Sequence, residues 1–289
     1  MDEAIRLDRR GPAAALLSAL LFGLSAPLAK GLLAGAPPQL LAGLLYLGSG
    51  GGLLLWWAYR RVSARRTGDG AAAAGEVPLG RGDLPWLAGA TLFGGVLAPL
   101  LLLVGLDRTP AAATSLLLNL EAVFTALLAW TVFREHAHRR IVAGMGLIVL
   151  GGLVLSWEGR AGWSGAAGPL AVAGACLCWG LDNNLTQRVS AGDPVQVAAL
   201  KGLVAGSVNV SIGWLLGGRL AGAGPAAGAL ALGFVSYGVS LVLFILALRR
   251  LGTARTGAYF STAPFIGALA SVLIRGEAVT TALLGGGAL

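Results

Sequence analysis

Long runs of apolar residues, separated by short polar connections, dominate this chain. Nine runs hold about 17 to 24 residues and a tenth is shorter; they lie at about 12–33, 38–58, 85–106, 110–133, 141–157, 167–189, 195–217, 226–248, 254–274 and 278–289. A helix of about 20 residues crosses a hydrocarbon core of about 30 Å. The pattern therefore predicts an all-α integral membrane protein with ten transmembrane helices. Run 278–289 has only 12 residues, so the tenth helix is either cut short or ends within the bilayer.

The fourth run, Pro110 to Phe133, carries a carboxylate inside an apolar segment. Winding the run at about 100° per residue separates a small or polar arc from an apolar one. The polar arc and its flank hold Thr114, Ser115, Asn119, Glu121 and Thr125. Because an ionisable group within a span is costly, it marks a candidate functional site. We expect Glu121 to line a cavity and to bind a substrate amine or couple a proton; the alternative is a structural ion pair or a hydrogen-bonded neutral acid.

The fourth run also resembles a later segment of the chain. Residues 109–135 align with residues 251–277 at a spacing of 142 positions, so that Thr114 meets Thr256 and Glu135 meets Glu277. A repeat of this length predicts two related halves, 1–158 and 159–289. Five spans in each half is an odd number, so the halves would insert in opposite senses. Inverted repeats place the substrate site near the bilayer midplane, at the interface between the halves.

Composition agrees with a membrane protein. Hydrophobic residues make up 56% of the 289 positions and charged residues only 12%, and the mean hydropathy is +0.78. A net charge of +8 could indicate nucleic acid, but the basic residues lie in short loops and form no continuous stripe. Anionic lipid headgroups explain them better. We therefore expect membrane lipids, and no nucleic acid, as partners.

The distribution of Lys and Arg predicts the orientation. With the N-terminus inside, fifteen of these residues fall in cytoplasmic loops and five outside, and Lys201 stays within a span. Such a bias favours a cytoplasmic N-terminus. The sequence thus predicts a multi-pass protein of a bacterial-type inner (plasma) membrane.

The most polar run is 167–189. Its polar side chains share one broad arc, opposite the leucines: Trp179, Asp182, Asn183, Thr186 and Gln187. This pattern indicates either a cavity wall or hydrogen bonding between helices. Lys201, within the next run, could pair with Asp182 or Glu121, or extend to the cytoplasmic surface.

Four aromatic residues could stack on an aromatic or cationic substrate: Tyr46, Trp163, Tyr237 and Tyr259. They could equally be packing residues or anchors at the membrane interface. Glu135 and Glu277 fall at opposite membrane faces in this topology, and we expect them to help seal the two ends.

Residues suited to metal or nucleophilic chemistry are few. Side chains two apart on a helix diverge, so Cys176 and Cys178 favour neither a disulfide nor a zinc site. His136 and His138 lie in a loop, outside any span. We therefore expect no metal, no cofactor and no enzyme activity. An ATP-binding loop of the GxxxxGK[ST] type does not occur in the sequence, so transport would run on gradients.

Paired motifs connect the two halves with a known family. The first span of each half carries an aromatic-Gly turn, Phe22-Gly23-Leu24-Ser25 and Trp179-Gly180-Leu181-Asp182. The fourth span of the second half has a proline, Pro264, followed by a closing Gly276-Glu277; the first half has Ala122 and Arg134 in the equivalent places. With these motifs the chain resembles EamA-type transporters of the drug/metabolite transporter superfamily, and most of all their bacterial amino-acid exporters.

This resemblance implies a secondary transporter that exports small metabolites, amino acids in particular, by alternating access. Ser25 would then line the cavity, beside the other polar residues named above. A multidrug exporter of lipophilic cations and a metabolite uptake permease are the near alternatives. An intramembrane enzyme would need serine or metal ligands near a histidine within a span, and a channel would need a ring of like polar groups. Neither histidine falls within a span, and no HExxH motif occurs, so an intramembrane enzyme and a channel are the more distant alternatives.

Overall fold

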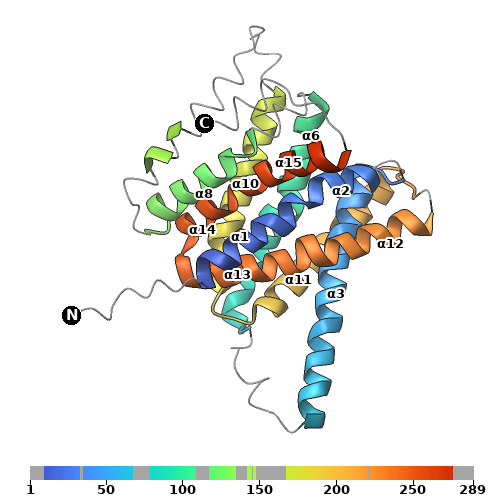
Figure 1. The fold of residues 1–289 in the computed structure, drawn as a ribbon, viewed down its shortest axis with the longest axis horizontal. Helices are drawn as coiled ribbons and strands as arrows, with labels where there is room; N and C mark the ends of the chain where they lie inside the picture. Colours follow the sequence, from blue (N-terminus) through green and yellow to red (C-terminus); the bar gives the residue numbers. More distant parts are fainter. Residues whose placement is uncertain are drawn as a thin grey trace.

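The computed structural model describes residues 10–32, 35–67, 79–108, 117–134, 142–144, 146–147, 167–220 and 222–275. Within these ranges the chain is helical and contains no strand (Figure 1). The elements are α1 Arg10–Gly23, α2 Ser25–Leu32, α3 Pro38–Thr67, η1 Arg81–Asp83, α5 Leu84–Ala90, η2 Thr91–Leu97, α6 Ala98–Arg108, α8 Leu120–Thr131, α10 Ala167–Val189, α11 Pro194–Leu215, α12 Ala223–Leu232, η4 Gly233–Val239, α13 Ser240–Leu251, α14 Thr253–Phe260 and α15 Ala263–Arg275.

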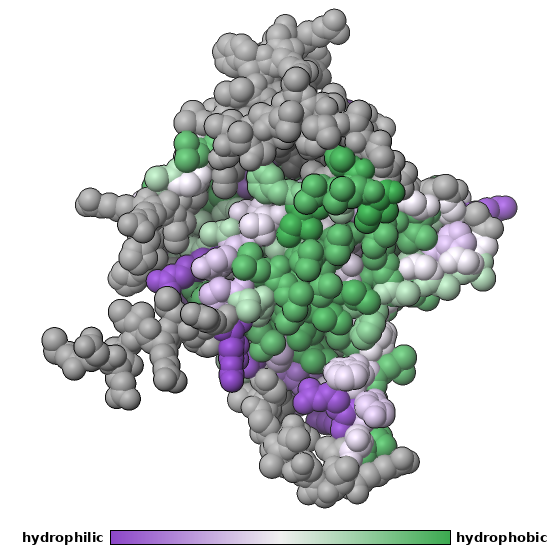
Figure 2. All heavy atoms as spheres, viewed as in Figure 1, coloured by the Kyte–Doolittle hydropathy of each residue, from purple (hydrophilic) through white to green (hydrophobic). Residues whose placement is uncertain are grey.

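Six helical stretches among the described residues are long and apolar enough to cross a membrane: Arg10–Ala29, Pro38–Ser63, Arg81–Leu102, Pro194–Leu215, Ala223–Leu251 and Thr253–Ile274. Leucines of α1 and α15 are widely exposed, as expected of side chains that face lipid. Figure 2 shows apolar side chains gathered over the middle of one face, with hydrophilic residues near its lower edge. The prediction of a multi-pass membrane protein is confirmed.

Most of the predicted runs agree with the helices to within a few residues, and the end of α3 differs most. Helix α10 spans the predicted 167–189, whereas α3 continues nine residues beyond the predicted end at 58. Figure 1 shows α3 projecting beyond its neighbours. Arginine is a good helix former, so the basic stretch after Tyr59 extends the helix. Runs 141–157 and 278–289 lie almost wholly outside the described residues.

Three predicted spans are interrupted by turns: the span over 12–33 has a turn at Leu24, between α1 and α2, and the other two occupy corresponding places in the repeat. The run predicted as one helix over 110–133 has a turn at Leu118 and Asn119, after which α8 begins. The amide of Glu121 donates to the Leu118 carbonyl at 3.0 Å, a bond three residues back. A similar turn at Ser261 and Thr262 separates α14 from α15. The two turns are about 142 residues apart, which is the spacing of the sequence repeat.

Where they pack, the segments that hold α8 and α14 run in opposite directions. A Cβ atom on Gly257 would lie 3.4 Å from Cγ2 of Thr125. Further along α8, Ala129 shares a buried cluster with Ala254. Residue numbers thus rise along α8 as they fall along α14, so the helices are antiparallel.

Two π-helical segments, η2 and η4, lie within long helices, again 142 residues apart. In η2 the amide of Ala98 donates to the Phe93 carbonyl, five residues back. Such segments are rare and are frequent at functional sites. Hydrophobic periodicity does not reveal them, because one extra residue barely changes the pattern of a span that is apolar on all sides.

Glycines bring α3 and α11 close together along most of their length. A Cβ on Gly43 would lie 2.5 Å from a methyl of Val210, and one on Gly50 would lie 2.3 Å from the Leu203 nitrogen. Side chains other than hydrogen do not fit at such distances, which explains the glycines in these apolar runs. The contacts place α3 and α11 antiparallel to each other.

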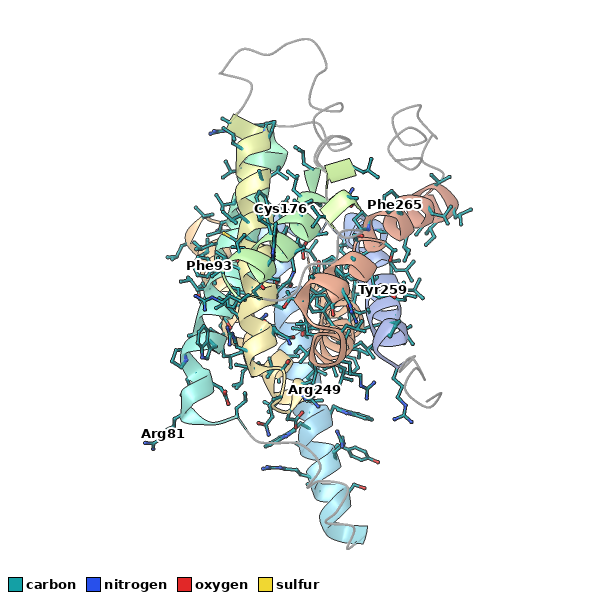
Figure 3. The ribbon with its side chains drawn as sticks, turned by 90° about the vertical axis from the view of Figure 1, so that its left-hand side faces the viewer. Arg81, Phe93, Cys176, Arg249, Tyr259 and Phe265 are labelled. Atoms are coloured by element: carbon teal, nitrogen blue, oxygen red, sulfur yellow. The ribbon has the colours of Figure 1, made fainter. Side chains whose placement is uncertain are left out.

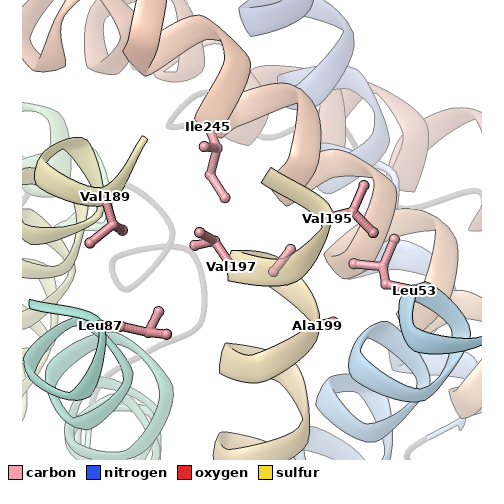
Figure 4. Packing of buried hydrophobic residues seen from close by; sticks show 8 residues of the cluster. Leu53, Leu87, Val189, Val195, Val197, Ala199 and Ile245 are labelled. Atoms are coloured by element: carbon pink, nitrogen blue, oxygen red, sulfur yellow. The ribbon is translucent and has the colours of Figure 1, made fainter. Parts of the chain in front are cut away.

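The largest buried apolar cluster joins five helices at one end of the molecule. It comprises Leu53, Leu87, Val189, Val195, Val197, Ala198, Ala199 and Ile245. They come from α3, α5, α10, α11 and α13, and Figure 4 shows these side chains converging. In Figure 3, Arg81 and Arg249 lie toward one end, and Cys176 and Phe265 toward the other. We call the first the Arg249 end. The guanidinium of Arg249 donates there to the carbonyls of Ser190 and Gly192, between α10 and α11.

Candidate functional site

Polar side chains of α10 meet the beginning of α8. The Asn183 amide nitrogen donates to Oε1 of Glu121 and to Oγ1 of Thr125, both at 3.0 Å. The neighbouring Asn184 donates to the Thr125 carbonyl at 3.0 Å and to the Gly180 carbonyl at 2.8 Å. Gly180 permits this contact, because a Cβ there would lie 3.0 Å from the Thr125 nitrogen. Glu121 is therefore held by a neutral amide, and no cation pairs with it among the described residues.

A buried ion pair joins α10 to α11. Lys201 donates to Asp182, and the two side chains are only 5% and 14% exposed. Thr186 completes a triangle: its hydroxyl accepts from Lys201 at 2.9 Å and donates to Asp182 at 2.9 Å. The alternative that Lys201 extends to the surface is wrong. Lys201 and Asp182 neutralise each other. The Glu121 carboxylate therefore has no counter-ion among the described residues.

The backbone of η2 accepts hydrogen bonds from three helices. The Gly94 carbonyl receives the indole N–H of Trp179 at 3.1 Å and the hydroxyl of Tyr46 at 3.4 Å. The next carbonyl, that of Gly95, receives the Asn209 amide at 2.7 Å. In a π turn the backbone amides donate to the carbonyl five residues back instead of four. Side-chain donors can then bond to carbonyls that the backbone of a regular α-helix would occupy.

Aromatic rings continue from this point toward α1. Tyr46 packs edge-on against Tyr237 of η4 with centroids 5.6 Å apart, and Tyr237 contacts Phe22 at 5.4 Å. The side chains of Tyr237 and Ser25 also hydrogen-bond. Tyr46, Asp182 and Glu121 lie close enough to interact electrostatically. We name the following set the central cluster: Ser25, Tyr46, Glu121, Trp179, Asp182, Asn183, Lys201 and Tyr237.

Several predicted site residues do not join the central cluster. Tyr259 is 37% exposed and makes no ring contact with the central cluster within the part of the chain that the structure describes. Asn119 lies in the turn before α8, half-buried and without a capping hydrogen bond from its side chain. Gln187 keeps a buried Oε1 with no hydrogen-bond partner. The other predicted residues lie outside the described residues: Thr114, Ser115, Glu135, Trp163 and Glu277.

The described residues do not form a metal site. Across the described ranges, no group of three or more His, Cys, Asp or Glu residues could hold a metal ion. The Cys176 thiol is buried and donates to the Leu117 carbonyl at 3.5 Å. Cys178 is a free, half-buried cysteine.

Sequence reasoning missed three residues that build the site. Asn184 is 1% exposed and bonds to α8, although helical winding places it nearer the leucines. Gly94 and Asn209 were not singled out. Two signals in the sequence could have indicated them: the Gly94-Gly95 pair within the run 85–106, and Asn209 as an amide side chain within the run 195–217.

Comparisons with known proteins agree with this architecture. A transporter of Methanothermobacter thermautotrophicus, described as uncharacterized, is 29% identical over 271 residues, which cover 91% of this chain and 78% of its own length. A solved crystal structure has the same fold, with a TM-score of 0.73 at 20% identity over 96% of this chain and 92% of its own. The EamA-like transporter family matches the chain twice, at residues 9–157 and 166–289. The chain belongs to the EamA-like transporter family and is a membrane transporter.

Proposed function

We propose that this transporter is a secondary carrier that exports a small amine-bearing metabolite, such as an amino acid, by alternating access. The observation that carries the proposal is the environment of Glu121. Its carboxylate lies inside the bundle beside Asn183, Tyr46 and Asp182, and lacks a cationic partner among the described residues. A half-buried carboxylate without a counter-ion is costly inside a membrane-spanning bundle, so the site favours a proton or a substrate ammonium there.

Two inverted halves would give such a carrier its two states. Three features support the inverted repeat. The π-helical segments and the turns within the fourth and ninth spans recur about 142 residues apart, α8 and α14 are antiparallel, and the family matches the chain once in each half. Two related halves permit two nearly equivalent packings, between which a bound substrate can shift the population.

Apolar packing joins the two halves in several places. At the Arg249 end, one cluster connects α3 and α5 of the first half to α10, α11 and α13 of the second, and a smaller cluster connects α8 to α14. Toward the opposite end, one cluster gathers Ala36, Leu41, Leu45 and Ala229, and another gathers Leu117, Val172 and Cys176. A carrier that alternates between two states would have to separate some of these contacts each time it changes state.

Aromatic side chains keep a second substrate class open. Tyr46 lies beside the carboxylates and Tyr237 packs against Tyr46, and aromatic faces attract organic cations as well as ammonium groups. A lipophilic-cation exporter is therefore the second candidate. Uptake instead of export would use the same site in the reverse direction.

Counterflow in proteoliposomes tests the proposal. Purified protein is reconstituted in vesicles loaded with unlabelled amino acids, and uptake of each labelled amino acid and of labelled tetraphenylphosphonium is followed with and without a pH gradient. We expect saturable counterflow of one class. Glu121→Gln should abolish it or remove its dependence on the pH gradient, because the neutral amide does not titrate and offers an ammonium group no opposite charge. The groups that face Glu121 and could share its proton are Asp182 and Cys176 of α10 and Tyr46 of α3.

A matched control makes the same chemical change away from the central cluster. Asp83 ends η1, near the Arg249 end, and accepts a hydrogen bond from the Gly80 amide at 2.8 Å. Asp83→Asn should transport as the unaltered protein does. Full transport by Glu121→Gln with an unchanged pH dependence would refute the role of Glu121, and a current without saturation would indicate a channel.

A further inference from the structure

Four separate observations converge on Gly94, a residue that has no functional group of its own. Its carbonyl accepts from Trp179 of α10 and from Tyr46 of α3. Its α-carbon lies against Asp182, because a Cβ there would be 1.9 Å from Oδ2 of that carboxylate. It also sits within the π-helical segment η2. Three members of the central cluster, from two neighbouring helices, thus contact one backbone unit.

We propose that Gly94 is the positioning residue of the substrate site. Its carbonyl, presented by the π turn, fixes the Trp179 and Tyr46 side chains, and its missing side chain leaves room for Asp182 to reach Lys201. The inference rests on the proposed function, since it assumes that the central cluster binds substrate. Trp179 comes from α10 and Tyr46 from α3, whereas the carbonyl that positions both side chains comes from the backbone of η2.

The hydrogen bonds also determine what the aromatic residues offer to a ligand. The donors of Trp179 and Tyr46 are both directed at Gly94, so these residues present ring surface to a ligand more than hydrogen-bond donors. Ring surface beside the Glu121 carboxylate is the combination that recognises a cationic nitrogen. Displacing the rings from Gly94 should therefore weaken substrate binding more than it slows the conformational step.

Gly94→Ala tests the inference, with Gly51→Ala as the matched control. A Cβ at Gly51 would meet no atom within 4 Å, although Gly51 also lies inside a membrane-spanning helix. The first measurement needs no substrate. The eight tryptophans are labelled with 5-fluorotryptophan, and the ¹⁹F resonance of Trp179 is assigned by its loss in Trp179→Phe. We expect Gly94→Ala to shift that resonance and Gly51→Ala to leave it in place.

The second measurement is transport of tritiated L-phenylalanine and of tetraphenylphosphonium by the same variants. Gly94→Ala should raise the KM of the probe that moves by about tenfold, while Gly51→Ala stays near the unaltered value. Tyr46→Phe removes one donor and keeps the ring, so it should raise KM with little change in the maximal rate. Its control is Tyr59→Phe, the same change at a side chain that is 66% exposed.

The outcomes separate this inference from the proposed function. If the unaltered protein moves neither probe, the proposed function loses support, and the ¹⁹F result alone decides the role of Gly94. An unshifted Trp179 resonance in Gly94→Ala overturns the inference even if transport is normal. Should Gly94→Ala fail to fold, Tyr46→Phe decides: a loss of maximal rate or of protein yield without a change in KM means that Gly94 is merely structural.

Discussion

The two π-helical segments occupy corresponding positions in the repeat and differ in their surroundings. Around η2 lie hydrogen-bond donors and a carboxylate, and the Gly94 carbonyl accepts from Trp179 and Tyr46. Around η4 the contacts involve hydroxyls and rings but no charge: Tyr237 hydrogen-bonds with Ser25 and stacks on neighbouring rings, and Gly233 lies against the backbone of Leu45. The backbone geometry is shared, but the charged groups are concentrated around η2.

The ion pair of the central cluster follows the same asymmetry. Asp182 and Lys201 stand 157 residues after Ser25 and Leu44, which is the spacing of the two aromatic-Gly motifs. The first half thus has a hydroxyl and an aliphatic side chain where the second has two charges. A repeated scaffold can therefore hold an asymmetric site, in which the second half supplies the ion pair and the first half supplies uncharged side chains at the corresponding positions.

The largest expected effect comes from removing one member of the ion pair. Lys201→Met leaves Asp182 buried without its cation and should destabilise the protein by about 3–5 kcal/mol. Leu44→Met, at the corresponding position of the first half, conserves volume and should cost less than about 1.5 kcal/mol. Thermal unfolding in detergent measures both. The double variant Lys201→Met with Asp182→Asn should recover much of the loss, and an equally unstable double variant would contradict this account.

Adding one methyl group to each π-helical segment should have different consequences. In Gly233→Ala the new Cβ would lie 2.1 Å from the Leu45 carbonyl oxygen, so two backbones must separate, at a cost of about 1–3 kcal/mol. In Gly94→Ala the nearest atoms belong to the Asp182 carboxylate, which can rotate away, but the Asp182 Cβ would lie 2.6 Å from the new Cβ and moves only with α10. Part of this clash is therefore relieved without moving a backbone. We therefore expect Gly233→Ala to lose more thermal stability than Gly94→Ala. The reverse order would show that Asp182 is held more rigidly than the backbone of α3.

Periodicity predicted a multi-pass membrane protein correctly because apolar length is a direct requirement of the bilayer, and six of the described helical stretches meet that requirement. Run 167–189 coincides with α10, and the polar arc of Asp182 and Asn183 does face neighbouring helices. The turn at Leu118 and Asn119 was not foreseen, because no proline or glycine lies near it in the run. The π-helical segments escaped prediction because a single extra residue leaves no mark on a run without faces.

Partners within the site were harder to predict than its members. From the sequence, Lys201 could pair with Asp182, pair with Glu121 or extend to the surface. Only the packing of α11 against α10 identifies Asp182 as its partner. Asn184 is turned toward α8 because Gly180 allows the two helices to approach closely. The role of Gly94 depends on a carbonyl, and a carbonyl is present at every position, so nothing in the residue type distinguishes it.

The smallest expected effect concerns a single hydroxyl on the polar side of the site. Thr125→Val keeps the shape of the side chain and removes the acceptor that Asn183 uses at 3.0 Å. Asn183 retains its bond to Glu121, so the cost should be about 1 kcal/mol. Thr131→Val makes the same change six residues later, at an exposed hydroxyl bonded to its own helix, and should stay within about 0.5 kcal/mol. Thermal unfolding compares the two variants. If Thr125→Val proves neutral while Glu121→Gln abolishes transport, the polar contacts of α8 serve the ligand more than the fold, and the asymmetry between the two halves is functional.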